Sequence, residues 1–279
     1  MSFNLLLQYL LPKSILSRLA AKIASCRVPL IKNFIIEQFC RFYHIDMLDA
    51  LDPNYFHYSN FNDFFTRALR PTARPIADDK KAIISPVDGK IWQIGAVGAG
   101  AIIAKGKGFT LEQLLADTKD AGHFQNANFA VLYLAPSDYH RIHMPIDGKL
   151  CSMRYVPGKL FSVSPAVVDH IPDVFARNER VISLFDTEVG KLAAIFVGAM
   201  IVGSIETKWA GVVAPGVSKE VVSWSYDQQN LQFARGAEIG QFKLGSTVIL
   251  LFPKGAMRWE ENLRPGKPIK MGQKLGVMS

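Results

Sequence analysis

The segment DYHRIHMP (138–145) contains two histidines, His140 and His143, shortly after the apolar run Phe129–Leu134. Imidazole titrates near neutral pH, so either ring could act as an acid or a base. On a helix this spacing would place both rings on one face, as in a metal pair. Pro145 and the preceding strand instead favour extended backbone, where an odd spacing turns the rings to opposite faces. No Cys, Asp or Glu stands at a recognisable third-ligand spacing, so we expect no metal site. For each of the two histidines, the alternative to acid–base chemistry is a structural role, with the ring hydrogen-bonded to the backbone.

A candidate nucleophile precedes a later apolar run. LGST (244–247) stands just before Val248–Phe252, so Ser246 lies at the mouth of a predicted buried strand, and Gly245 leaves its own carbonyl open to attack. Asp88 could orient a histidine. An Asp, a His and a Ser from separate segments can form a nucleophilic triad in any chain order. The residue types alone do not establish one, because most Gly-Ser-Thr tripeptides and Asp-Gly pairs are ordinary turns.

Short strands must position these residues. From about Ala82 onward, Gly and Pro punctuate β-rich runs, and Asp88-Gly89 and Asp147-Gly148 are strong turn signals. One helical stretch, Thr110–Ala116, interrupts them. The predicted strands are Ala82–Ile84, Lys90–Ile94, Phe129–Leu134, Leu192–Val197 and Val248–Phe252.

The first 45 residues show helical rather than strand-like patterning. Residues 3–43 predict two helices divided near Val28-Pro29, each with an apolar stripe at helical spacing. The sequence therefore predicts an α+β fold, with a helical segment over 1–45 and a compact antiparallel β-rich catalytic domain over 46–279.

Charge suggests a partner for the helical segment. Lys and Arg number 32 against 24 Asp and Glu, a net charge of +8. Residues 1–45 supply +5 of it, with six basic residues against Glu37 alone. Apolar stripes edged with Lys and Arg are typical of helices in a membrane interface, so we expect an anionic lipid surface rather than nucleic acid. The same periodicity would serve helices that pack on the protein's own core, and that alternative stays open.

Three scattered cysteines predict no disulfide framework and favour a reducing compartment. Leu5–Leu11 is short and lacks a preceding basic region, so we expect no signal peptide. The acid-free run up to Ile36 resembles a mitochondrial presequence, which remains an alternative. No run reaches the ~18 uncharged apolar residues that span a bilayer, so we do not expect a multi-span membrane protein.

Six motifs occur together and in order along nearly the whole chain. Together they resemble the bacterial phosphatidylserine decarboxylases, pyruvoyl-dependent enzymes made as self-cleaving proenzymes. The first 45 residues match that family in character more than in letters. The motifs are FNDFFTRALRP (61–71), SPVDGK (85–90), KGKGFTLEQLL (105–115), DYHRIHMP (138–145), VGSIETKWAG (202–211) and LGST (244–247).

The resemblance implies roles for individual residues. The family's autocatalytic triad would fall on Asp88, His143 and Ser246, with Ser246 attacking the Gly245 carbonyl. Cleavage would yield chains 1–245 and 246–279 and turn Ser246 into a covalent pyruvoyl cofactor. That group would form a Schiff base with the amine of phosphatidylserine, and loss of CO₂ would give phosphatidylethanolamine. His140 is the candidate for proton transfer in the substrate step.

The resemblance also implies partners. We expect phosphatidylserine in the bilayer, an anionic membrane surface, and a heterodimer of the protein's own cleavage products. The expected location is peripheral, on the cytoplasmic face of a bacterial cell membrane, with the mitochondrial inner membrane as the alternative.

Two other functions stay open. A serine hydrolase could use Asp88, His143 and Ser246 without self-cleavage, although no GxSxG elbow frames the serine. A membrane-bound carrier is the non-enzyme alternative, because PIKMG (268–272) loosely resembles the lysine turn of lipoyl and biotinyl carriers. The intact mass separates the three: a cleaved chain, an uncleaved chain, or an added lipoyl or biotin group.

Overall fold

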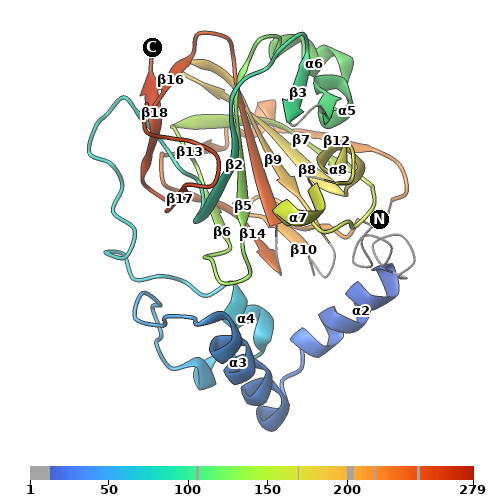
Figure 1. The fold of residues 1–279 in the computed structure, drawn as a ribbon, viewed down its shortest axis with the longest axis vertical. Helices are drawn as coiled ribbons and strands as arrows, with labels where there is room; N and C mark the ends of the chain where they lie inside the picture. Colours follow the sequence, from blue (N-terminus) through green and yellow to red (C-terminus); the bar gives the residue numbers. More distant parts are fainter. Residues whose placement is uncertain (1–12, 105–106, 169, 200–203, 217, 244–245) are drawn as a thin grey trace.

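A nine-stranded antiparallel sheet forms the centre of the molecule (Figure 1). The computed structural model of the chain describes residues 13–104, 107–168, 170–199, 204–216, 218–243 and 246–279. The strands of the central sheet are, in spatial order, β12 (Val222–Ser225), β7 (Gly148–Val156), β8 (Arg180–Thr187), β9 (Gly190–Val197), β15 (Ser246–Phe252), β5 (Asn128–Leu134), β2 (Gly89–Ala96) and β17 (Pro268–Ile269), with β13 (Gln232–Phe233) paired to β7.

Smaller sheets pack around this one. The first has four strands: β11 (Gly211–Ala214), β10 (Ser204–Thr207), β14 (Glu238–Lys243) and β6 (Arg141–His143). The second contains β1 (Ala82–Ile84), β18 (Lys274–Met278) and β16 (Met257–Trp259), and β3 (Ala101–Ala104) forms a hairpin with β4 (Lys107–Thr110). The antiparallel sheets and the few helices confirm the α+β class.

The central strands are buried on both faces. Every residue of β15 is buried; Val248, Leu250 and Phe252 face one hydrophobic cluster, while Ile249 and Leu251 face the other. A strand covered on both sides reads as a continuous apolar run, which is why the sequence predicted these strands. All five predicted runs lie in strands β1, β2, β5, β9 and β15.

Short helices cover one face of the central sheet (Figure 1). Helix α5 (Leu111–Leu115) begins with a capping box, in which the Thr110 side chain and Gln113 satisfy each other's backbone N–H groups. This confirms the helix predicted over 110–116. The other helices on this side are α6 (Thr118–His123), α7 (Pro165–Val168) and α8 (Val174–Arg177).

The N-terminal helices lie at one end of the β domain, away from the C-terminus (Figure 1). They are α2 (Lys13–Ala24) and α3 (Pro29–Tyr43), followed by the 3₁₀ helix η1 (Tyr55–His57) and by α4 (Phe61–Phe65). Pro29 starts α3 because its fixed φ suits a first helical turn and its missing N–H is not needed there. The predicted pair of helices is therefore confirmed for the described residues; residues 1–12, including Leu5–Leu11, lie outside them.

The helical segment has two apolar faces. One face forms a separate small core, in which Ile36 of α3 packs with Phe64 and Phe65 of α4. The opposite face leaves Leu30 84%, Phe34 63% and Phe42 77% exposed. The alternative that these helices pack on the protein's own core is therefore correct for one face, and the membrane interface stays a prediction for the exposed face.

Candidate active site

Ser246 is the first residue of β15 and lies level with the end of β5. Ser246 pairs with Leu134 of β5. On the other side of β5, Lys90 of β2 pairs with Tyr133, so Gly89, the first residue of β2, lies opposite Leu134 as well. Ser246 and Gly89 are thus about 10 Å apart, which is two strand spacings. A Cβ on Gly89 would fall 2.2 Å from Tyr133 O, so only glycine allows β2 to begin so close to β5. This tight start places Asp88 beside the end of β5.

Asp88 is held by an arginine that the sequence reading missed. Arg74 Nε donates to both carboxylate oxygens of Asp88, at 2.9 and 3.0 Å, and Nη2 donates to Oδ2 at 2.5 Å. The backbone N–H of Met271 donates to Asp88 Oδ1 at 2.9 Å. Arg74 also bonds Asp49 at 2.7 Å. Burial by itself lowers the pKa of Arg74. The hydrogen bonds and charges of the two carboxylates outweigh that effect and raise the pKa above its usual range. The Asp88 carboxylate is therefore fixed in position by charge-assisted hydrogen bonds.

His143 is buried and has partners at both ring nitrogens. Nδ1 lies 2.8 Å from Gly236 O, which can only accept, so Nδ1 carries the proton and Nε2 accepts from the Tyr139 hydroxyl at 3.0 Å. Burial lowers the pKa of His143, and the Arg141 charge adds to that effect; the hydrogen bond to Gly236 O, the Glu238 charge and, more weakly, the Asp88 charge oppose it. The backbone N–H of His143 donates to Pro86 O at 2.9 Å, which joins β6 to the segment that carries Asp88. The ring is thus neutral, with a basic lone pair at Nε2.

His140 is fully buried in a different environment. Its Nε2 donates to Ala135 O at 3.0 Å, and its Nδ1 has no hydrogen-bond partner. The ring stacks on Phe65 of α4 with centroids 4.0 Å apart. Burial, together with the nearby Arg67 charge, lowers the pKa of His140 to about 3. The two rings therefore have separate partners, as an odd spacing in extended backbone would give.

The strand register separates the two histidines along β14. Phe242 N donates to His140 O at 3.0 Å, whereas His143 pairs with Glu238. β14 ends at Lys243, three residues before Ser246 in the sequence, so His140 lies beside the end of β14 that is nearer Ser246 along the chain. His143 lies about 10 Å farther back, three residues along the ladder.

Buried polar atoms without partners gather around these strand ends. In a folded protein such atoms are few, and each carries a desolvation penalty of about 1–3 kcal/mol. Ser204, at the start of β10, pairs with Lys243 at the end of β14. Their concentration here, where the described chain supplies no partners, is typical of a site completed by a ligand or by chemistry. The atoms are Ser246 Oγ, Thr247 Oγ1, His140 Nδ1, Ser204 Oγ, and Nε and Nη1 of Arg67.

The proposed triad is brought together only in part. Asp88 and His143 lie on adjoining segments, and Ser246 and Asp88 flank the same end of β5. No hydrogen bond joins the side chains of Asp88, His143 and Ser246. Gly245 lies outside the described residues. Among those described, no group of three or more His, Cys, Asp or Glu side chains is arranged to hold a metal ion.

Sequence reasoning missed four residues around the site: Phe65, Arg67, Arg74 and Tyr139. Phe65 and Arg67 lie in FNDFFTRALRP, and Tyr139 lies in DYHRIHMP, so the motifs already marked their segments. Arg74 lies outside every quoted motif. Its role depends on the approach of a loop to Asp88, for which the sequence carries no local signal.

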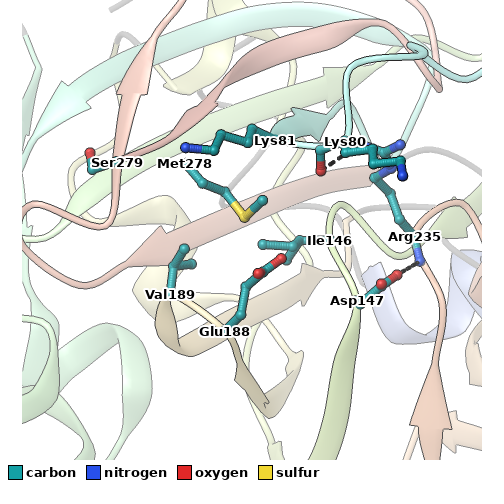
Figure 2. Close-up of a pocket in the computed structure, with 9 residues that line it drawn as sticks. All are labelled: Lys80, Lys81, Ile146, Asp147, Glu188, Val189, Arg235, Met278 and Ser279. Carbon is teal, nitrogen blue, oxygen red and sulfur yellow. Dashed lines mark hydrogen bonds between the residues drawn. The ribbon is translucent and has the colours of Figure 1, made fainter.

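A separate pocket of about 710 Å³ opens at the other end of the sheet (Figure 2). Glu188 and Val189 line it just before β9 begins, and β9 then runs to Val197 beside Thr247, about 23 Å away. The Arg235 guanidinium there donates to backbone carbonyls of Asp79 and Ala82. None of the four proposed catalytic residues lines this pocket.

Comparisons with known proteins complete the description. A family model described as phosphatidylserine decarboxylase matches residues 61–277, and a second model, described as PSD, matches residues 3–44. The chain is 48% identical to the phosphatidylserine decarboxylase proenzyme of Azotobacter vinelandii, covering 99% of this chain and 98% of the relative. It is 50% identical to the one of Hahella chejuensis, covering 98% and 92%. The corresponding proenzyme of Pseudomonas putida is 48% identical, with 97% and 96% covered. No helix in the described part of the chain has the length and apolarity needed to cross a bilayer.

Proposed function

This chain belongs to the phosphatidylserine decarboxylase family and is a decarboxylase, and from that premise we propose that it makes its own pyruvoyl cofactor by cleaving the Gly245–Ser246 bond. The observation that carries the proposal is the Ser246 hydroxyl, which is fully buried, has no partner and stands at the first position of β15. The relatives are named proenzymes, which accords with a processed chain.

Self-cleavage begins at Ser246. His143 removes the hydroxyl proton, and the oxygen attacks the Gly245 carbonyl carbon, so that an ester replaces the peptide bond. Loss of the Cα proton of residue 246 then expels Gly245 as a carboxylate and leaves dehydroalanine. Tautomerisation and addition of water release ammonia and leave a ketone at the new N-terminus. The products are chains 1–245 and 246–279, and they remain associated through the central sheet because β15 lies between β5 and β9.

His143 and Asp88 supply the base. The ring is neutral at neutral pH because burial lowers its pKa, and Gly236 O holds the proton on Nδ1. Deprotonation of Ser246 requires Nε2 to give up the Tyr139 hydroxyl and requires the His143 ring and Ser246 to approach each other, because no hydrogen bond joins them in the structure. The charges of Glu238 and, more weakly, of Asp88 favour the imidazolium that forms at His143. Asp88 acts from its fixed place against Arg74.

The same position suits the mature cofactor. A ketone at residue 246 would lie among buried polar atoms that lack partners, His140 Nδ1 among them, so the residues present fit the group. When formed, the group supplies a carbonyl that reacts with the substrate amine and accepts the electron pair released with CO₂. Neutral His140 can accept a hydrogen bond at Nδ1. It donates a proton there only after taking one up, which an anionic substrate beside the ring favours.

The helical segment accounts for access to a lipid substrate. Leu30, Phe34 and Phe42 expose an apolar face on α3, and the basic residues Lys22 and Arg27, which precede α3 in the chain, are also exposed. Lys32 does not contribute, because its buried Nζ donates to Phe56 O at 2.7 Å. We therefore propose peripheral attachment to an anionic membrane surface through this segment, with 1–45 as the membrane segment and 46–279 as the catalytic domain.

Intact mass of the purified protein tests the self-cleavage. The expected masses are those of residues 1–245 and of 246–279 with a pyruvoyl N-terminus, whereas Ser246→Ala should give one uncleaved chain. A fully active preparation that contains only the intact polypeptide would overturn the proposal. It would favour the serine hydrolase if that activity were esterolytic.

A further inference from the structure

Arg67 is a buried arginine without a counter-ion. The residue is 5% exposed, and its Nε and Nη1 atoms have no hydrogen-bond partner. The guanidinium carbon lies 5.3 Å from the centroid of the Phe64 ring, and the Asp88 and Asp138 charges act on the guanidinium group only through space, without a hydrogen bond. Within the described residues, no carboxylate forms an ion pair with it. A buried charge in this condition is strongly disfavoured unless something neutralises it.

Two other arginines of the described residues, the buried Arg180 and the partly buried Arg74, have hydrogen-bond partners for their guanidinium groups. Arg180, which is 2% exposed, donates to backbone carbonyls through Nε, Nη1 and Nη2, at 2.6 to 3.0 Å. Arg74 donates to Asp88 and Asp49. Because the fold satisfies these two guanidinium groups with its own atoms, the unpaired state of Arg67 indicates a partner from outside the chain.

Arg67 lies where the helical segment meets the proposed active site. It follows α4 by two residues, and the preceding residue, Thr66, accepts a hydrogen bond from Arg141 Nε of β6 at 2.8 Å. Phe65, one residue earlier, stacks on His140. The Arg67 charge contributes to lowering the pKa of His140, after burial. The guanidinium therefore lies within electrostatic range of the histidine nearest the start of β15.

We infer that Arg67 binds the phosphate of the phospholipid headgroup and so positions the substrate over residue 246. This inference rests on the proposed function of the same site. Helices α3 and α4 lie at one end of the β domain (Figure 1), and Arg67 follows α4 by two residues, so a headgroup that enters beside these helices meets Arg67. A phosphodiester brings one negative charge and several strong acceptors, which match an unpaired guanidinium.

The phosphate fits this role better than the carboxylate does. The carboxylate must lose its charge as CO₂ leaves, so an arginine paired with it would stabilise the ground state and slow the reaction. The phosphate keeps its charge from substrate to product. A contact with it provides uniform binding, which lowers KM and leaves kcat nearly unchanged.

The test compares two substrates in the purified, self-cleaved enzyme. One is dihexanoyl phosphatidylserine, and the other is its methyl phosphotriester, which keeps the shape but removes the phosphate charge. For the diester, Arg67→Gln should raise KM about 10- to 100-fold, the range for a lost hydrogen bond to a charged group, with little change in kcat. For the triester, the KM of the wild type should already be raised, and Arg67→Gln should raise that KM little further. Arg67→Lys should recover part of the diester KM.

Arg70→Gln is the matched control, since Arg70 is exposed three residues along the chain and should leave both constants unchanged. An equal loss with diester and triester, or a loss confined to kcat, would show that Arg67 does not act on the phosphate. If neither Arg67→Gln nor Arg67→Lys self-cleaves, Arg67 serves maturation and the inference is wrong. Failure of the proposed function itself would be seen separately, as a wild-type chain that neither cleaves nor decarboxylates the diester.

Discussion

The imidazole of His140 lies against the ring of Phe65, with centroids 4.0 Å apart and planes inclined by 24°. Phe65 belongs to α4 and is also part of the small core that α3 and α4 share. One phenylalanine therefore touches both the exposed helical segment and the proposed catalytic histidine. The helical segment therefore borders the proposed site and also carries the exposed apolar face that we propose contacts lipid.

Removing that ring should affect stability and catalysis together. Phe65→Ala should destabilise the protein by about 3–5 kcal/mol, as for other buried phenylalanines, and should lower decarboxylation further because His140 loses its support. Phe61→Ala is the control, because Phe61 lies in the same core but has no recorded contact with His140. Unfolding free energies are measured on the uncleaved Ser246→Ala background, and activity on the cleaved forms. Equal activity losses in the two variants would contradict a specific role for the stacking.

The two histidines should separate maturation from turnover. His143→Ala should block self-cleavage, because Ser246 loses its base, whereas His140→Ala should cleave and then fail to decarboxylate. Gel analysis of each variant, followed by measurement of released CO₂, distinguishes the steps. His140 lies nearer the start of β15 along the β14 ladder, so the opposite pattern would assign the maturation base to His140.

Asp88 and Asp49 provide a matched pair, because both bind Arg74. Asp88→Ala should block cleavage, since it removes one of the two carboxylate charges that favour the His143 imidazolium, the other being that of Glu238. Asp49→Ala removes the other partner of Arg74 and should still cleave, because Asp88 keeps its own hydrogen bonds. Cleavage of both variants would remove Asp88 from the mechanism. If both remain uncleaved, Arg74 rather than Asp88 is the critical group.

Self-cleavage should tolerate mildly acidic pH. The neutral form of His143 is the base, and burial lowers its pKa below the ordinary 6.5, so the base form persists as the pH falls past that value. The rate constant should therefore be level above about pH 6.5 and should decline only below it. Time courses of freshly synthesised chain, buffered at a series of pH values, measure this. A midpoint at or above 6.5 would exclude His143, as the structure places it, from the role of base.

The exposed face of α3 should control membrane binding. Replacing Leu30, Phe34 and Phe42 together by serine should sharply reduce sedimentation with phosphatidylglycerol vesicles, while self-cleavage continues, because none of the three lies in a described core cluster. Val212→Ser, at a 59% exposed position on β11, should bind as the wild type does. High salt should weaken wild-type binding without abolishing it, since charge is screened within ~8 Å but apolar burial persists. Full binding by the triple variant would place the lipid contact elsewhere.

The sequence alone determined the family and the most apolar strands of the central sheet, β2, β5, β9 and β15, but not β7 or β8, which lie in the same sheet. A strand buried on both faces must be apolar at every position, so TVILLF could be read directly as the interior strand β15. The signal for the helix that follows Thr110 is equally local, because Thr110 and Gln113, which form the capping box, lie within its cap and first turn. The motifs around Asp88, His143 and Ser246 sufficed for the resemblance, and the comparisons confirm that family.

Only the tertiary structure decided which side of an apolar helix is covered. Ile36 and Phe34 are both apolar residues of α3, yet Ile36 is buried and Phe34 is 63% exposed, because α4 packs on one side only. The partner of Asp88 was likewise beyond the sequence, since Arg74 reaches it from a segment with no local pattern. The unpaired state of Arg67 depends on every neighbour at once. Such properties arise from contacts between distant segments, and no periodicity within a segment encodes them.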